Sequence, residues 1–98
     1  MWTGTLEVDL LLGDVHSLKE KRSVVRPIIA EVKRRYQLSV AEVGHQELYR
    51  RTAVGVAVVA ADRAHVVEVL DEVERMLVGR PDTEPLSVRR RLISSDDD

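Results

Sequence analysis

Basic side chains crowd a short segment near the N-terminus, directly after an alternating apolar run. Residues 16–22 read His-Ser-Leu-Lys-Glu-Lys-Arg, and Ser17 and Glu20 have the spacing of a helix-capping box. Positive charge in the first turns of a helix opposes the helix dipole, so helix stability does not explain these cations. Phosphate binding would explain these cations, because free backbone N–H groups of a first helical turn also attract anions. The predicted phosphate ligands are Lys19, Lys21, Arg22 and Arg26. The alternative is a solvated helix face.

A second polar segment lies in the middle of the chain, where residues 44–51 read Gly-His-Gln-Glu-Leu-Tyr-Arg-Arg. This connection is longer than a tight hairpin needs, and such loops often carry function. We expect Arg50 and Arg51 to help bind phosphate, and His45, Gln46 and Tyr49 to make selective contacts. A general acid or base could come from the same set. A loop that hydrogen-bonds itself or a partner is the alternative.

Several kinds of chemistry lack the residues that they require. The chain has no cysteine, which excludes disulfides and thiolate metal sites, and its three histidines share no spacing typical of metal ligands. Glycine-rich phosphate loops, nucleophile elbows and paired-carboxylate motifs are also missing. We therefore predict no catalytic residue, no metal and no cofactor. A small-molecule-binding or enzymatic role around His45 is kept as a further alternative.

Apolar periodicity predicts the elements that position these segments. Alternation of period two predicts strands over residues 2–12, 38–43, 52–60 and 86–93. Helical spacing predicts one helix over residues 17–36 and a second between Asp62 and Gly79. Pro27 predicts a bend in the first helix, and the alternative is a regular helix that begins near Ser23. Pro81 and Pro85 are expected to bound a loop.

The predicted order is βαββαβ. Right-handed crossovers place the first and third strands side by side in the centre. The sequence thus predicts an α+β fold: a ferredoxin-like sandwich with a four-stranded antiparallel sheet and two helices on one face. The basic run Arg89-Arg90-Arg91 puts charge on both faces of the last strand, which is typical of a sheet edge.

Length and charge set the remaining expectations. Ninety-eight residues predict a single domain over 1–93, followed by an acidic disordered tail over 94–98. Residues 17–35 hold seven basic and two acidic side chains, whereas residues 62–84 hold seven acidic and three basic ones. This asymmetry in charge is informative about binding partners and not about the fold, although pairing between the two helices is another explanation. With no signal peptide and no apolar stretch of bilayer length, we expect a soluble, cytoplasmic protein with no membrane partner.

The side of the sheet without helices is the second candidate surface. It would show Ala53, Gly55, Ala57 and Val59 from the third strand, a flat apolar patch that invites association. A homodimer packed through the sheets is one interpretation, and a solvated face is the alternative. An RNA platform on this face is disfavoured, because no aromatic residue falls on the open face of the central strands.

Three stretches of the chain resemble a known family. They are residues 16–22, residues 39–48 (Ser-Val-Ala-Glu-Val-Gly-His-Gln-Glu-Leu) and residues 52–59 (Thr-Ala-Val-Gly-Val-Ala-Val-Val). Together they are similar to the YlxP-like family, small bacterial proteins of unknown function, over nearly the whole chain up to Arg91. The resemblance implies a ferredoxin-like fold. It also implies association with RNA or the ribosome, because the genes of the family commonly lie among those for translation initiation and ribosome-binding factors.

The first hypothesis is therefore a non-enzymatic accessory protein that binds structured RNA or a ribosomal particle through phosphate charge. The second is a homo-oligomeric interaction module that uses the apolar sheet face. Pro27 and the acidic tail are departures from the family pattern. The tail would repel nucleic acid if it folded back near the basic segment.

Overall fold

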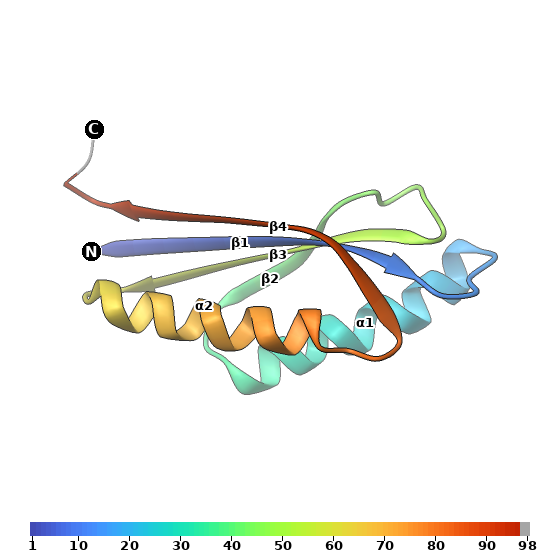
Figure 1. The fold of residues 1–98 in the computed structure, drawn as a ribbon, viewed down its shortest axis with the longest axis horizontal. Helices are drawn as coiled ribbons and strands as arrows, with labels where there is room; N and C mark the ends of the chain where they lie inside the picture. The colour runs from blue at the N-terminus through green and yellow to red at the C-terminus, as the bar shows by residue number, and fades with distance from the viewer. Residues whose placement is uncertain (97–98) are drawn as a thin grey trace.

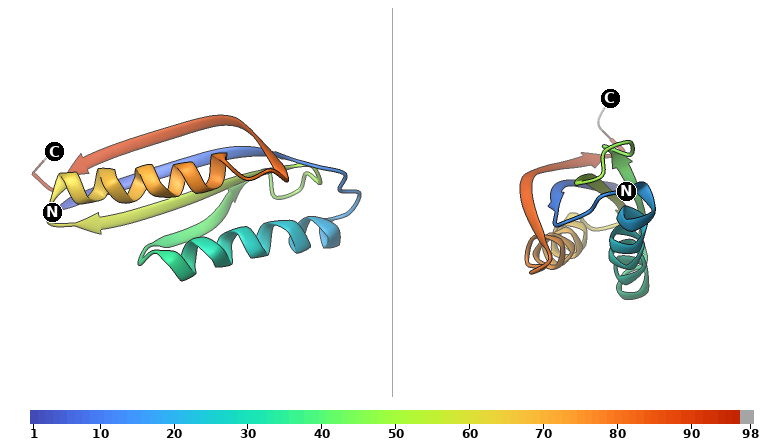
Figure 2. Two further views of the ribbon diagram at one scale, coloured as in Figure 1. Left: turned by 60° about the horizontal axis from the view of Figure 1, so that its bottom comes forward. Right: turned by 90° about the vertical axis from the view of Figure 1, so that its right-hand side faces the viewer.

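Six elements follow one another in the predicted order in the computed structural model, which describes residues 1–96 (Figure 1). The strands are β1 (Trp2–Leu12), β2 (Ser39–Gly44), β3 (Arg51–Ala60) and β4 (Thr83–Ser94), and the helices are α1 (Leu18–Arg35) and α2 (Arg63–Val78). The sheet is antiparallel with the order β2-β3-β1-β4, so β1 and β3 are central as predicted. Both helices cover the same face (Figure 2). The ferredoxin-like prediction is confirmed.

The core lies between the sheet and the helices, because alternate residues of the central strands are apolar. Buried side chains come from both central strands and both helices, and the largest of them are Leu6, Leu10, Ile28, Leu70 and Leu77. Helix α1 packs mainly against the edge strand β2, whereas α2 lies over β1 and β3. The start of α1 therefore flanks the edge of the sheet where β2 ends.

Each helix begins at a polar cap. The Ser17 hydroxyl accepts the Glu20 N–H at 3.1 Å, and the Glu20 carboxylate accepts the His16 N–H at 3.1 Å. These contacts start α1 at Leu18 and hold the basic segment inside the helix, so the alternative start near Ser23 is wrong. The bend at Pro27 stays a prediction. Asp62 caps α2 by accepting the Ala64 N–H at 3.0 Å.

Strand β4 is longer than predicted and corrects two boundaries. Pro85 does not bound a loop: it lies within β4 opposite Leu10, beside a register shift in the pairing with β1. An edge strand tolerates proline because its outward N–H has no ladder partner to lose. Ser94 belongs to β4 rather than to a tail, and the Ser95 N–H donates to the Met1 carbonyl at 2.8 Å. The Asp96 N–H donates to the Ser94 hydroxyl at 3.2 Å, and the last two residues of the predicted tail, Asp97 and Asp98, lie outside the described residues.

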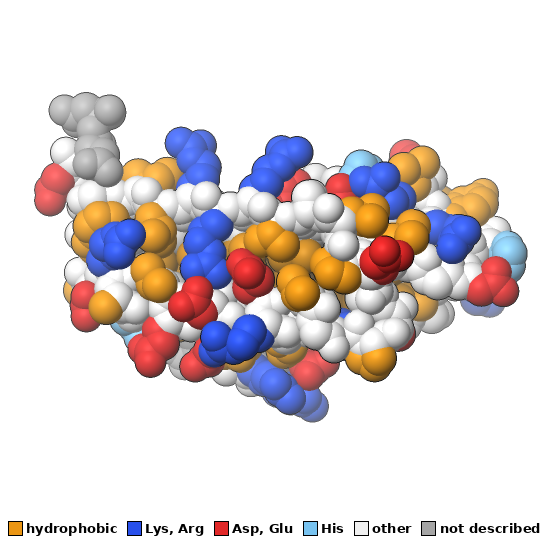
Figure 3. Space-filling view, viewed as in Figure 1, with side chains coloured by type: hydrophobic (Ala, Val, Ile, Leu, Met, Phe, Trp, Pro, Cys, Tyr) orange, Lys and Arg blue, Asp and Glu red, His pale blue; other side chains and the backbone are white. Residues whose placement is uncertain are grey.

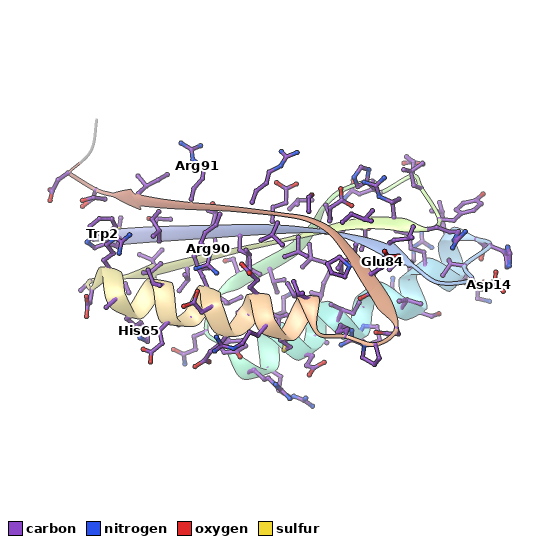
Figure 4. The ribbon with its side chains drawn as sticks, in the orientation of Figure 1. Trp2, Asp14, His65, Glu84, Arg90 and Arg91 are labelled. Carbon is purple, nitrogen blue, oxygen red and sulfur yellow. The ribbon has the colours of Figure 1, made fainter. Side chains whose placement is uncertain are left out.

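Two acidic side chains of α2, Asp71 and Glu74, pair with the sheet edge. Arg90 of β4 contacts Asp71 at 2.7 Å and Glu74 at 3.0 Å, and it points toward α2 while Arg91 points away (Figure 4). Figure 3 shows acidic and basic side chains intermixed over this side of the molecule. Within residues 1–96, no ion pair joins a cation of α1 to an acid of α2, so helix-to-helix pairing does not explain the charge asymmetry.

The approach of α2 to the sheet depends on Gly4, and this generates a prediction. A Cβ at Gly4 would overlap a methyl group of Val66 and lie 2.8 Å from the Leu70 side chain. Gly4→Ala should therefore lower the free energy of unfolding by about 1–3 kcal/mol, measured by urea denaturation. Gly13→Ala is the matched control, because no described atom lies within 4 Å of its added Cβ. Equal stability of the two variants would contradict the prediction.

Candidate functional site

An ion pair between Lys21 and Glu42 joins the basic segment 16–22 to the segment 39–48. Lys21 is only 3% exposed, and its Nζ donates to the His45 carbonyl at 2.6 Å and contacts Oε2 of Glu42 at 3.0 Å. The Thr52 hydroxyl donates to the same carboxylate oxygen at 2.5 Å. The prediction that Lys21 binds phosphate is therefore wrong: its ammonium group is turned inward and neutralised by Glu42.

The sequence folds this way because both charges lie on inward-facing positions. Lys21 precedes Val25, Ile28 and Val32 on the buried stripe of α1, and Glu42 follows Val40 on the inward face of β2. Because Lys21 cannot reach water and the Glu42 side chain is only 21% exposed, the two charges pair and satisfy further hydrogen bonds within the protein. This contact unites the segment 16–22 with the segment 39–48.

His45 connects the two faces of the sheet at this end. Its backbone has φ +58°, in the left-handed region that most residues other than glycine avoid and that histidine, asparagine and aspartate adopt more often than the rest. The turned backbone presents the carbonyl to Lys21 and to the Leu48 N–H, which donates at 3.1 Å. The imidazole lies on the other side, with Nε2 3.1 Å from the Asp9 carboxylate.

Asp9 and Arg51 form the second charged pair. Arg51 donates from Nε to Oδ1 at 3.1 Å and from its terminal NH2 group to Oδ2 at 2.7 Å. The hydrogen bonds from Arg51 lower the pKa of Asp9 below its usual value, with a smaller contribution from His45 and against the opposing effect of burial. His45 Nε2 also lies 3.2 Å from Arg51, so one tautomer donates to Asp9 and the other accepts from Arg51. The guanidinium group of Arg51 is thus paired with a carboxylate of its own chain.

The other predicted phosphate ligands remain at the surface. Lys19, Arg22 and Arg26 are exposed and form no ion pair with any other residue from 1 to 96. Lys33 continues the same helical face, so four cations follow one side of α1 over roughly 21 Å. Arg50 is exposed as well, and its Nε donates to the carbonyl of Gly13, which directly follows β1. Figure 1 shows that β1 ends at the same end of the molecule where α1 begins.

A groove runs between this part of α1 and the loop after β2. Its volume is about 370 Å³, and its lining includes Leu18, Lys21, Arg22, Val25, Arg26, Ile29, Glu42, Gln46 and Glu47. The Gln46 side chain donates to the Glu42 carbonyl at 3.3 Å, which holds the loop against β2. Tyr49 is half-exposed farther along the loop, 49% accessible. Of the three residues predicted for selective contacts, Gln46 lines the groove, whereas His45 and Tyr49 do not.

The open face of the sheet carries a separate apolar patch. Val43 and Val59 are 54% and 59% exposed there, and Gly55 and Ala57 lie between them in a hollow of about 400 Å³. Ala53 is only 3% exposed, opposite Asp9 and Gly44 in the ladder, so its predicted part in self-association is wrong.

Glu42 and Asp9 are the residues that sequence reasoning missed as partners. Glu42 left one signal, since a carboxylate on the inward face of a strand requires a buried cation or donor. Asp9 lies diagonally across the β1–β3 ladder from Arg51, a placement that only the strand register reveals. In residues 1–96 we find no group of three His, Asp or Glu side chains that could hold a metal ion, and neither helix could cross a membrane.

Comparisons with known proteins identify relatives by sequence. Residues 3–90 match the family described as "Protein of unknown function (DUF503)". The chain is 32% identical over 81 residues to the uncharacterized protein YlxP of Bacillus subtilis (strain 168), a match that covers 83% of this chain and 88% of the relative.

Solved structures resemble the chain in fold alone. The de novo designed protein Foldit4 matches with a TM-score of 0.57 and 13% identity, over 97% of this chain and 99% of the design. A second design, LFR1 1 with ferredoxin fold, matches with a TM-score of 0.54 and 16% identity, over 99% of this chain and 89% of the design. These neighbours confirm the ferredoxin-like architecture.

The buried pair leads to a prediction about stability. Lys21→Met removes the cation that neutralises Glu42 and one of the two donors to the His45 carbonyl, and should cost about 2–4 kcal/mol of unfolding free energy in urea. Lys21→Met/Glu42→Gln should recover part of the loss, because the amide is neutral and still accepts from Thr52. Additive losses in this double-mutant cycle would show that the two groups do not interact.

Proposed function

This chain belongs to the DUF503 family, whose function is unknown, and we propose that it is a non-enzymatic protein that binds RNA through the exposed basic face of α1. Structured RNA, free or within a ribosomal particle, is the proposed partner. The proposal depends on one observation: Lys19, Arg22, Arg26 and Lys33 share one solvent-facing side of α1 and lack carboxylate partners within residues 1–96.

The electrostatics of the cations support this proposal. Cations that stabilised the protein would pair with its own carboxylates, as Lys21, Arg51, Arg80 and Arg90 do. Unpaired cations along a helix repel one another slightly, and the negative charge of a phosphate backbone offsets this repulsion. Binding also releases the counterions that were condensed on the RNA. Arg50 extends the positive surface beyond the start of α1. Glu47 lies across the groove from Arg22 and Arg26, and its negative charge limits the positive surface on that side.

The test is the salt dependence of RNA binding. Arg22→Gln/Arg26→Gln removes two proposed phosphate contacts. It should lower the slope of log affinity against log salt by about 1.8 for a duplex, and the affinity near 0.1 M salt by roughly tenfold to a hundredfold. Fluorescence anisotropy with a labelled RNA hairpin measures both quantities.

The matched control removes the same charge elsewhere. Arg63 and Arg75 are exposed on α2, away from the basic face, so Arg63→Gln/Arg75→Gln should leave the slope nearly unchanged. A slope near zero for the unmodified protein, or equal losses in the two double variants, would refute binding through α1.

Self-association through the open sheet face is a second candidate function. The observation that favours it is the pair of exposed valines, Val43 and Val59, on either side of the hollow above Gly55 and Ala57. Exposed apolar area of this kind gains free energy when a second apolar surface covers it.

Light scattering tests this second candidate. If two sheets pack face to face, the unmodified protein has the mass of a dimer, and Ala57→Glu returns it to a monomer by placing a carboxylate in the apolar contact. Leu86→Glu, at an exposed position of β4, is the control and should leave the dimer intact. A monomer before mutation contradicts the proposal.

A further inference from the structure

The groove beside the basic face has two chemically different walls. Leu18, Val25 and Ile29 contribute apolar side chains from α1, and Glu42, Gln46 and Glu47 contribute polar ones from β2 and its following loop. Arg22 and Arg26 line the same groove. A ligand here would meet a flat apolar surface, hydrogen-bonding groups opposite, and cations beside both.

Hydrogen-bonding capacity remains unused within the groove. Lys21 is only 3% exposed and directs its ammonium group to the His45 carbonyl and to Glu42, so it is not available to a ligand. In Glu42, Oε2 receives both Lys21 and Thr52, whereas Oε1 has no partner among residues 1–96. The Gln46 side-chain amide donates one N–H to the Glu42 carbonyl, and its second N–H has no partner among the same residues. One donor, on Gln46, and one acceptor, on Glu42, therefore remain on residues that line the groove.

We propose that this groove receives one unpaired nucleobase of RNA, while Arg22 and Arg26 hold the adjacent phosphates. The proposal rests on the RNA-binding function of α1 and specifies what part of an RNA that surface recognises. A base has two flat faces that suit the wall of Leu18, Val25 and Ile29, and an edge with donors and acceptors that suits Glu42 and Gln46. The volume of about 370 Å³ is within the range of small-ligand pockets.

Paired bases cannot use this groove. In an A-form duplex the base faces are stacked and their pairing edges are occupied, so only a loop, bulge or end can supply the ligand. Every base carries a donor next to an acceptor on its pairing edge, and the groove offers one of each. Binding should therefore depend on whether a base is unpaired more than on which base it is.

The experiment compares two RNAs at one salt concentration: a 16-base-pair duplex, and the same duplex with a single-nucleotide bulge. The bulged RNA should bind about tenfold more tightly, because apolar contacts to the faces of the base and hydrogen bonds to its edge are added to the phosphate contacts. Ile29→Trp and Leu18→Trp, which fill the groove from opposite ends, should reduce the bulged RNA to the affinity of the duplex. Ala64→Trp adds the same side chain at an exposed position of α2 and should preserve the difference.

The possible results distinguish the nucleobase site from RNA binding by α1, the function on which that site rests. Equal binding of the two RNAs, unaffected by either groove variant, overturns the nucleobase site and leaves phosphate binding by α1 standing. Loss of duplex affinity in Ile29→Trp, with circular dichroism unchanged, also overturns it, since a filled groove should spare the phosphate contacts. Failure of both RNAs to bind overturns the RNA-binding function itself.

Discussion

The ammonium group of Lys21 holds three parts of the chain at one point: the first turn of α1, the end of β2 and the loop that follows. Desolvating a lysine and a glutamate is expensive, and their attraction recovers the cost only when the geometry is good and further hydrogen bonds are made. Here the His45 carbonyl and the Thr52 hydroxyl provide those bonds. The pair fixes how α1 is rotated about its axis, which keeps Arg22 and Arg26 outside while Val25 and Ile28 remain inside.

Some basic side chains of this protein form ion pairs that hold elements together, and others are exposed to solvent. Arg51 and Arg90 each bind a carboxylate across the sheet or between sheet and helix, and Arg80 joins α1 to the segment after α2 through Glu31. The cations on the outer side of α1 take no part in these contacts. A net charge of −2 hides this division, because paired and unpaired charges count equally in a sum.

Most of the fold could be predicted because its signals are local. Residues 2–12 and 52–60 alternate, Ser17 and Asp62 cap the helices, and the order of elements leaves few possible topologies. Pro85 predicts a loop because proline opposes a strand in general, and only its place on a sheet edge makes it acceptable there. The spacing of Lys21 from Val25 and Ile28 places it on the buried stripe, but lysine is so seldom buried that its charge favours a surface position.

The site was less predictable because its contacts join distant residues. Arg22 and Arg26 are four positions apart on one helix, so their common exposure follows from the sequence alone. Asp9 and Arg51 are 42 residues apart, and Lys21 and His45 are 24 apart. Their meeting depends on strand register and on the path of a loop with one left-handed residue, His45.

The two outer strands have consequences for how copies of this protein can meet. Along β4, Pro85, the register shift beside it and the run of arginines leave no smooth row of amides for another chain to extend. Along β2, the strand is only six residues long, carries an inward carboxylate, and has the Glu42 carbonyl already occupied by Gln46. Neither edge strand therefore favours pairing with a strand of another copy, the contact from which fibres grow. The helical face and the open sheet face remain accessible for contacts that form closed oligomers.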